Sequence, residues 1–157
     1  MDSIYLTFKS LHILGAILFL GNIIVTGWWK YMADLTKDPK IIAFAQRQVT
    51  LTDFVFTAGG VVLVLATGIG NAIIYHMDYW NIRWMAWGMW LFVVSGVIWA
   101  AILIPLQIKQ ARMAKQFAIT GSIPDEYWLL SKLWMGFGVA ATVLPLINIY
   151  WMVFKPA

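Results

Sequence analysis

The chain has 157 residues, of which 62% are hydrophobic and 11% are charged, and its mean hydropathy is +0.78. Soluble domains hold about 45–50% apolar and about 25% charged residues, so this composition predicts an integral membrane protein. Cysteine is absent, which excludes disulfides, thiolate metal sites, iron–sulfur ligation and thiol catalysis. The formal net charge of +4 does not favour nucleic acid as a partner, because the basic residues form no single patch.

Four apolar segments are each long enough to cross roughly 30 Å of hydrocarbon as a helix. The first has no positive charge before it and no small-residue cleavage pattern, so we expect it to be retained rather than removed. Trp and Tyr mark the segment ends, as is typical of membrane interfaces. We therefore predict an all-α integral membrane four-helix bundle that forms a single domain over residues 1–157. The spans are expected at residues 5–29, 54–75, 84–108 and 127–154.

The basic residues gather in two of the three connections between these segments. By the positive-inside rule these two connections face the cytoplasm, and both termini then lie outside. The basic residues on the predicted cytoplasmic side are Lys30, Lys37, Lys40, Arg47, Lys109, Arg112, Lys115 and Lys132, whereas the other side holds Lys9, Arg83 and Lys155.

The first connection contains a helix start signal. Asp38 followed by Pro39 is typical of an N-cap with proline at the first helical position. The sequence predicts a short amphipathic cytoplasmic helix from Lys40, either separate or running straight into the second span. Its apolar face, expected towards the membrane, is formed by Ile41, Ile42, Ala45 and Val49.

A histidine lies about two turns inside the first apolar segment. An imidazole in hydrocarbon is costly, and such a residue usually serves a ligand, a proton or a metal. His12 is therefore a candidate cofactor or metal ligand, a hydrogen-bonded structural residue, or a proton carrier. Lys9, Gly15 and Phe19 share its helix face, where Gly15 would leave space for a flat ligand and Phe19 would pack against it.

Two asparagines are expected at the depth of His12. Asn71 and Asn148 either hydrogen-bond between helices or support His12, an amide carbonyl fixing its tautomer. His76, at the end of the second span, is a second candidate metal or haem ligand, or an exposed loop residue.

Further polar and soft side chains leave other chemistry open. Asp53 and Lys132, near the ends of their spans, are candidates to pair across the bundle. Methionines are soft ligands for Cu(I), and they are also ordinary packing residues in membranes. The methionines that, with His12 and His76, would form a copper site are Met77, Met85, Met89 and Met152.

Several catalytic signatures are missing from the sequence. It contains no nucleophile–base motif, no Walker sequence, no glycine-rich dinucleotide fingerprint and no His-Glu-x-x-His metal-hydrolase motif. Hydrolysis and phosphoryl transfer therefore have no support.

Several short motifs carry a resemblance to a known family. The first is Leu11-His12-Ile13-Leu14-Gly15-Ala16, followed by Gly21-Asn22, Thr26 and Trp29-Lys30; the second is Leu51-Thr52-Asp53-Phe54-Val55-Phe56-Thr57, followed by Gly59-Gly60 and Thr67-Gly68. Together they resemble a bacterial family of predicted integral membrane proteins of unknown function, over most of the chain. The resemblance implies a location in the bacterial cytoplasmic (inner) membrane.

That family is similar in layout to two better-known groups. One is the HemJ-type protoporphyrinogen oxidases, compact four-helix proteins that bind haem b, and the other is the CopD copper-resistance membrane proteins. The Leu-His pair that HemJ-type proteins carry early in their first span matches Leu11-His12, which implies His12 as a haem ligand. Lys132 is a possible analogue of their important lysine, and Lys9 would meet a haem propionate.

The sequence therefore supports three functions. The first is a haem b-binding membrane redox protein that uses His12 as an axial ligand, for electron transfer or for oxidation of a small lipophilic substrate. The second is a non-catalytic subunit or assembly factor of a larger membrane complex, which would have a membrane protein partner or form a homo-oligomer. The third is copper handling. In each case the chain contacts the lipid bilayer.

Overall fold

A computed structural model describes residues 3–78 and 80–156. Over these residues it contains four helices that are long and apolar enough to cross a membrane, and no strand, so the predicted all-helical membrane architecture is confirmed. The first helix is α1 (Ser3–Thr36) and the fourth is α6 (Asp125–Phe154). The second is built from α2 (Pro39–Thr52), the π-helix η1 (Asp53–Thr57) and α3 (Ala58–Ile74); the third from α4 (Arg83–Ile98), the π-helix η2 (Trp99–Leu103) and α5 (Ile104–Thr120).

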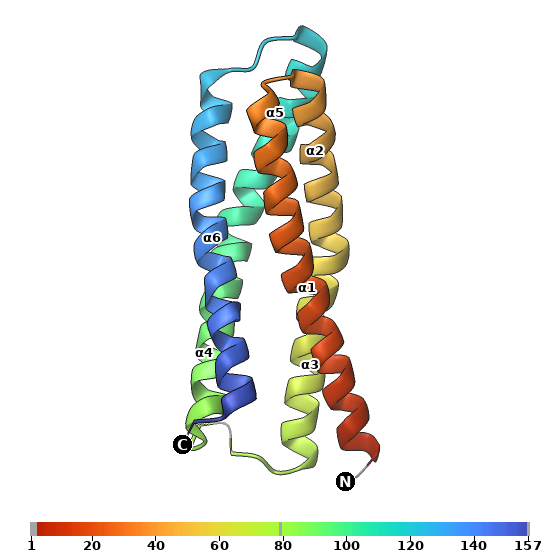
Figure 1. Ribbon diagram of the computed structural model, residues 1–157, viewed down its shortest axis with the longest axis vertical. Coiled ribbons are helices and arrows are strands. Elements are labelled where there is room, and N and C mark those ends of the chain that lie inside the picture. Colours follow the sequence, from red (N-terminus) through yellow and green to blue (C-terminus); the bar gives the residue numbers. More distant parts are fainter. Residues whose placement is uncertain (1–2, 79, 157) are drawn as a thin grey trace.

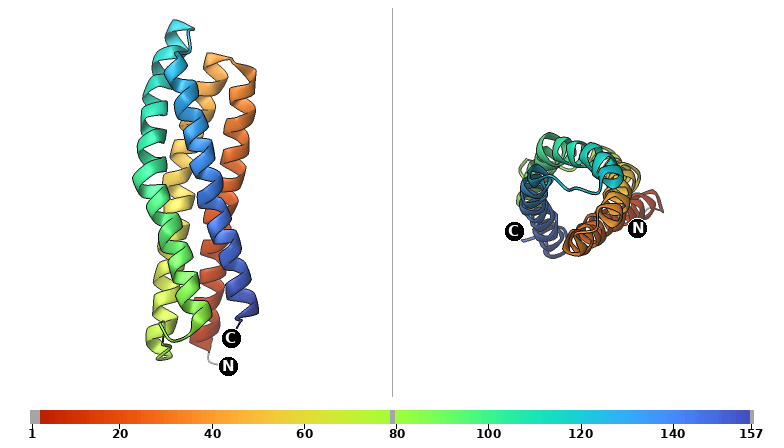
Figure 2. Two further views of the ribbon diagram at one scale, coloured as in Figure 1. Left: turned by 90° about the vertical axis from the view of Figure 1, so that its left-hand side faces the viewer. Right: turned by 90° about the horizontal axis from the view of Figure 1, so that it is seen from above.

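At one end the helices pack as two pairs, and along the bundle the third helix changes its main neighbour from the fourth helix to the second (Figure 1). Helix α1 packs against α3 and α2, α4 packs against α6, and α5 packs against α2. The third helix therefore crosses the bundle, from the side of α6 to the side of α2 (Figure 2). The start of α1 and the end of α6 lie near the α3–α4 connection, at the opposite end from the α1–α2 and α5–α6 connections.

Two helices extend beyond the predicted spans. The first ends at Thr36 rather than near residue 29. The third continues through the basic residues 109–115 to Thr120, as the sequence predicts for a helix that ends near Gly121. The second span was predicted to reach Tyr75, and α3 ends at Ile74. Hydropathy marks only the part of a helix that lies in hydrocarbon, so it does not show the turns that prolong the first helix.

The segment after Asp38 is not a separate surface helix. It is α2, which continues without a break through η1 into α3. The predicted cap is confirmed, because Asp38 Oδ1 accepts hydrogen bonds from the backbone nitrogens of Lys40, at 2.8 Å, and Ile41, at 3.2 Å. Ile42 and Val49 are only 1% exposed and pack inside the bundle, so the prediction that they face the membrane is wrong.

Glycines bring α1 and α3 into backbone contact. A Cβ on Gly15 would lie 2.9 Å from the carbonyl oxygen of Gly60, and a Cβ on Gly60 would lie 2.7 Å from that of Gly15. Small residues allow membrane helices to approach this closely. The prediction that Gly15 leaves space for a ligand is therefore wrong, since α3 already covers that face.

Two prolines interrupt helical hydrogen bonding, and the fold accommodates both. Pro145 in α6 has no N–H to give to the carbonyl of Ala141, and Ser95 Oγ on α4 donates to that oxygen instead, at 2.7 Å. Pro105 is the second residue of α5, and the wider turn of the preceding η2 makes room for its ring.

A buried ionic cluster joins the start of α6 to the end of α1. Lys30, predicted as a loop residue, is 1% exposed. Its Nζ lies 3.0 Å from each of Asp34 Oδ2, Tyr127 Oη and Ser131 Oγ. The Tyr127 and Ser131 hydroxyls also donate to the Asp34 carboxylate. Every charge in the cluster is thus paired, as burial requires.

Candidate functional site

The imidazole of His12 is held in one orientation by α3. Its Nδ1 lies 3.0 Å from the carbonyl oxygen of Val64 and 3.2 Å from Thr67 Oγ1, whose own proton goes to the carbonyl oxygen of Leu63 at 2.6 Å. A carbonyl only accepts, so Nδ1 carries the proton and Nε2 of the neutral ring carries the lone pair. The carbonyl oxygen of Val64, and not an asparagine amide as predicted, therefore fixes the tautomer of His12.

His12 faces a large apolar cavity between the two helix pairs. This space, the His12 cavity, has a volume of about 1020 Å³ and is walled by α1 and α3 on one side and by α4 and α6 on the other. Small-molecule and cofactor clefts hold roughly 300–1,000 Å³, so the cavity matches a large organic ligand. Of the residues predicted to bind a cofactor, it brings together Lys9, His12, Phe19, Asn71 and Asn148.

Two predicted residues lie outside this cavity. Gly15 is covered by Gly60, and His76 is an exposed residue with a φ of 48° in the turn after α3. His76 is therefore a turn residue outside the lining of the His12 cavity. Asp78 lies in the same connection, and its carboxylate accepts hydrogen bonds from the side chain and the backbone of Asn81, which lower the pKa of Asp78.

Four methionines line the same cavity as His12. They come from the α3–α4 connection, α4 and α6, so their gathering is a result of the tertiary fold. Within residues 3–78 and 80–156, no group of three or more His, Asp or Glu side chains is arranged to hold a metal ion. A metal in this cavity therefore needs soft ligands or a macrocycle. These methionines are Met77, Met85, Met89 and Met152.

Two buried amide oxygens in the cavity wall have no hydrogen-bond partner among the described residues. They are Oδ1 of Asn71 and Oδ1 of Asn148. The other end of the Asn148 amide donates to the carbonyl oxygen of Gly88 at 3.0 Å, which ties α6 to α4. An unpaired buried acceptor costs about 1–3 kcal/mol, so a bound donor would stabilise this wall.

Two lysines stand at the end of the His12 cavity nearest the chain termini. Lys9 Nζ lies 5.9 Å from the ring centroid of Tyr5, and Lys155 Nζ lies 5.0 Å from that of Trp84. Both lysines are exposed and both line the cavity. The helix face of His12 indicates Lys9 but not Lys155, because only the fold places the end of α6 on the same cavity as the start of α1.

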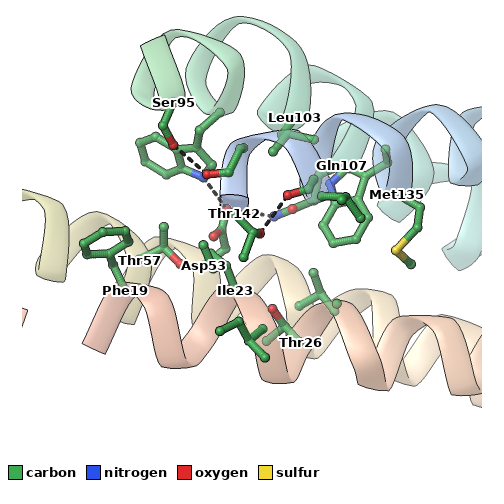
Figure 3. Close-up of a pocket in the computed structure, with 18 of the residues that line it drawn as sticks. Phe19, Ile23, Thr26, Asp53, Thr57, Ser95, Leu103, Gln107, Met135 and Thr142 are labelled. Atoms are coloured by element: carbon green, nitrogen blue, oxygen red, sulfur yellow. Dashed lines mark hydrogen bonds between the residues drawn. The ribbon is translucent and has the colours of Figure 1, made fainter. Parts of the chain in front are cut away.

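A second cavity of about 480 Å³ lies further along the bundle, and we name it the Asp53 cavity (Figure 3). Asp53 is 6% exposed, and its Oδ2 accepts from Trp99 Nε1 at 2.9 Å and from Gln107 Nε2 at 3.5 Å. Lys132 is exposed on α6, so the predicted Asp53–Lys132 pair does not form. Phe19 and Phe92 line both cavities, and their rings meet edge to face at 6.1 Å.

The fold and its two cavities define an α-helical membrane protein with internal space for ligands. Residues 6–156 match the family model described as predicted integral membrane protein (DUF2269), and the chain belongs to that family. The family predicted from the motifs of the first two spans is thereby confirmed. No curated protein and no solved structure gives a match.

Proposed function

We propose that the His12 cavity binds haem b, with His12 Nε2 as an axial ligand, and that the protein is a membrane redox protein. The observation that carries the proposal is the hydrogen bond from His12 Nδ1 to the carbonyl of Val64. A ligating histidine almost always donates its other ring nitrogen to such an acceptor, which fixes the ring and makes Nε2 a better ligand.

The residues around His12 fit a haem chemically. The walls are apolar, with Phe19, Phe92 and aliphatic side chains, and they would exclude water from a porphyrin. Lys9 and Lys155 would meet the propionates at the end nearest the termini. Methionine is a competent second axial ligand and raises the reduction potential, so the lining methionines are the candidates for that position.

When bound, haem supplies one-electron chemistry, and the protein sets its potential. In this chain the reduction potential would be set by the hydrogen bond to His12, the apolar walls and the two lysines. Either electron transfer or oxidation of a small lipophilic substrate is consistent with a cavity that borders lipid-facing helices.

The proposal includes an orientation in the bacterial cytoplasmic membrane, with both termini outside. Its support is the concentration of basic residues at the α1–α2 and α5–α6 end. Because the chain has no cysteine, single cysteines at Ser3 and Ser122 report the two ends directly. We expect a membrane-impermeant thiol reagent to label Ser3→Cys and not Ser122→Cys in intact cells; the opposite pattern would invert the topology.

The test of haem binding compares the two histidines of the chain. The detergent-purified protein is examined by absorption spectroscopy, oxidised and dithionite-reduced, beside His12→Ala and the matched control His76→Ala. We expect a Soret band and reduced α/β bands in the wild type and in His76→Ala, and loss or shift of these bands in His12→Ala. A colourless wild-type protein from haem-supplied cells would refute the proposal.

Copper handling is the second candidate, because four methionines line the cavity of His12. The test is Cu(I) binding, measured by competition with a chromogenic chelator. We expect the double variant Met85→Ala/Met89→Ala to lose the metal, whereas Met32→Ala, on an exposed face of α1, retains it. Equal binding by both variants would exclude this site. The role as a non-catalytic subunit stays a prediction, to be tested by copurification of a partner without any cofactor.

A further inference from the structure

The two π-helical segments of the described chain meet at the Asp53 cavity. Asp53 is the first residue of η1 and Trp99 is the first residue of η2, and the indole N–H of Trp99 donates to Asp53 Oδ2 at 2.9 Å. Short π-helices are rare and occur frequently at functional sites, where the extra residue reorients side chains. The Asp53 cavity is separate from the His12 cavity, where haem binding is proposed.

Asp53 is a buried carboxylate, and none of the described residues forms an ion pair with it. The side chains that hydrogen-bond to it, those of Trp99, Gln107 and Thr57, are neutral. Over residues 3–78 and 80–156 the ion pairs are Lys30 with Asp34 and Lys109 with Glu126, neither of which includes Asp53. A buried carboxylate is costly when no charge pairs with it, so a bound counter-charge would stabilise it.

The cavity that Asp53 faces is lined with aromatic side chains. Its lining includes Trp28 on α1, which is 61% exposed, and Val139 on α6, which is 57% exposed, so we place its opening between these two membrane-spanning helices. Figure 3 shows the carboxylate among side chains from α1, η1, α4, α5 and α6. Aromatic faces attract cations, and a desolvated site strengthens that attraction. The aromatic lining residues are Phe19, Trp28, Tyr31, Phe92, Trp99 and Trp134.

We propose that the Asp53 cavity binds a lipophilic organic cation, an ammonium compound that carries an apolar or aromatic group. The carboxylate supplies the counter-charge and the indole and phenyl rings hold the cation. The ligand is lipophilic because the opening lies between two membrane-spanning helices. This site goes beyond the proposed haem function, and its occupation does not require haem.

The test uses two probes that differ in charge alone. Benzyltrimethylammonium and neopentylbenzene have the same shape, with a quaternary nitrogen in the first and a carbon in the second. Saturable binding of radiolabelled benzyltrimethylammonium to the detergent-purified full chain is measured, and each unlabelled compound is used to displace it. We expect the cation to compete at least tenfold better than the hydrocarbon.

Three variants connect the binding to this cavity. Asp53→Asn keeps the side-chain shape and removes the charge, and we expect at least a tenfold loss of cation affinity. Gly138→Leu places a side chain in the cavity, since a Cβ there meets nothing within 4 Å, and it should abolish binding. The matched control is Gly136→Leu, which has the same free space but lies outside the lining and should bind as the wild type does.

Each result supports or overturns the proposal. No saturable binding to the wild type, equal competition by the two probes, or undiminished binding to Gly138→Leu would overturn it. If Asp53→Asn does not fold, the competition between the two probes and the comparison of Gly138→Leu with Gly136→Leu still test the proposal. The haem spectrum is read separately, so a colourless protein that binds the cation would refute the haem proposal alone.

Discussion

Replacement of Gly60 by alanine should separate α1 from α3. A Cβ on Gly60 would lie 2.7 Å from the carbonyl oxygen of Gly15 and 2.8 Å from the backbone nitrogen of Phe19. Both neighbours are backbone atoms, which cannot rotate away as a side chain can. The helices would have to move apart by roughly 0.5–1 Å to restore van der Waals separation.

The expected cost follows from this overlap. Overpacking at a tight contact destabilises a protein by about 1–3 kcal/mol. Gly59→Ala is the matched control, because a Cβ there meets nothing within 4 Å and alanine favours a helix by about 0.8–1 kcal/mol over glycine. The helix-propensity gain is common to both variants, so we expect Gly60→Ala to be less stable than Gly59→Ala by about 1–3 kcal/mol.

The assay is reversible unfolding in mixed micelles, with an increasing fraction of sodium dodecyl sulfate and far-ultraviolet circular dichroism as the readout. The same shift should disturb His12, since its acceptor Val64 lies one turn beyond Gly60 on α3. Equal unfolding of the two alanine variants would show that α1 and α3 are not in backbone contact, and the account of how His12 is positioned would fail with it.

Two further predictions concern charges. Lys30→Met should destabilise the protein by about 3–5 kcal/mol, because it leaves Asp34 without its buried partner. Lys109→Met breaks the exposed pair with Glu126 and should cost about 0–1 kcal/mol in the same unfolding assay. Comparable losses in the two lysine variants would contradict the buried cluster. Asp38→Ala should cost about 0.5–2 kcal/mol through loss of the α2 cap, and an unchanged unfolding curve would show that this cap contributes nothing.

The architecture of this protein can be predicted from the amino-acid sequence. Apolar segments of sufficient length must form helices in a bilayer, because no water is present there to pair with backbone groups. The cap at Asp38 was equally readable, since it depends on neighbours in the chain. His12 could be singled out because a polar ring in an apolar segment is exceptional.

Which residues share a site depends on how the helices pack, and this is visible only in the folded protein. Gly15 and Phe19 are one turn apart on α1, yet one is covered by α3 and the other lines both cavities. Two donors to Asp53, Trp99 and Gln107, come from a helix more than forty residues away in the chain, so the sequence gives no sign that they meet the carboxylate. Sequence pattern gives the period of a helix but not its rotation against a neighbour, and packing of glycines and prolines sets that rotation here.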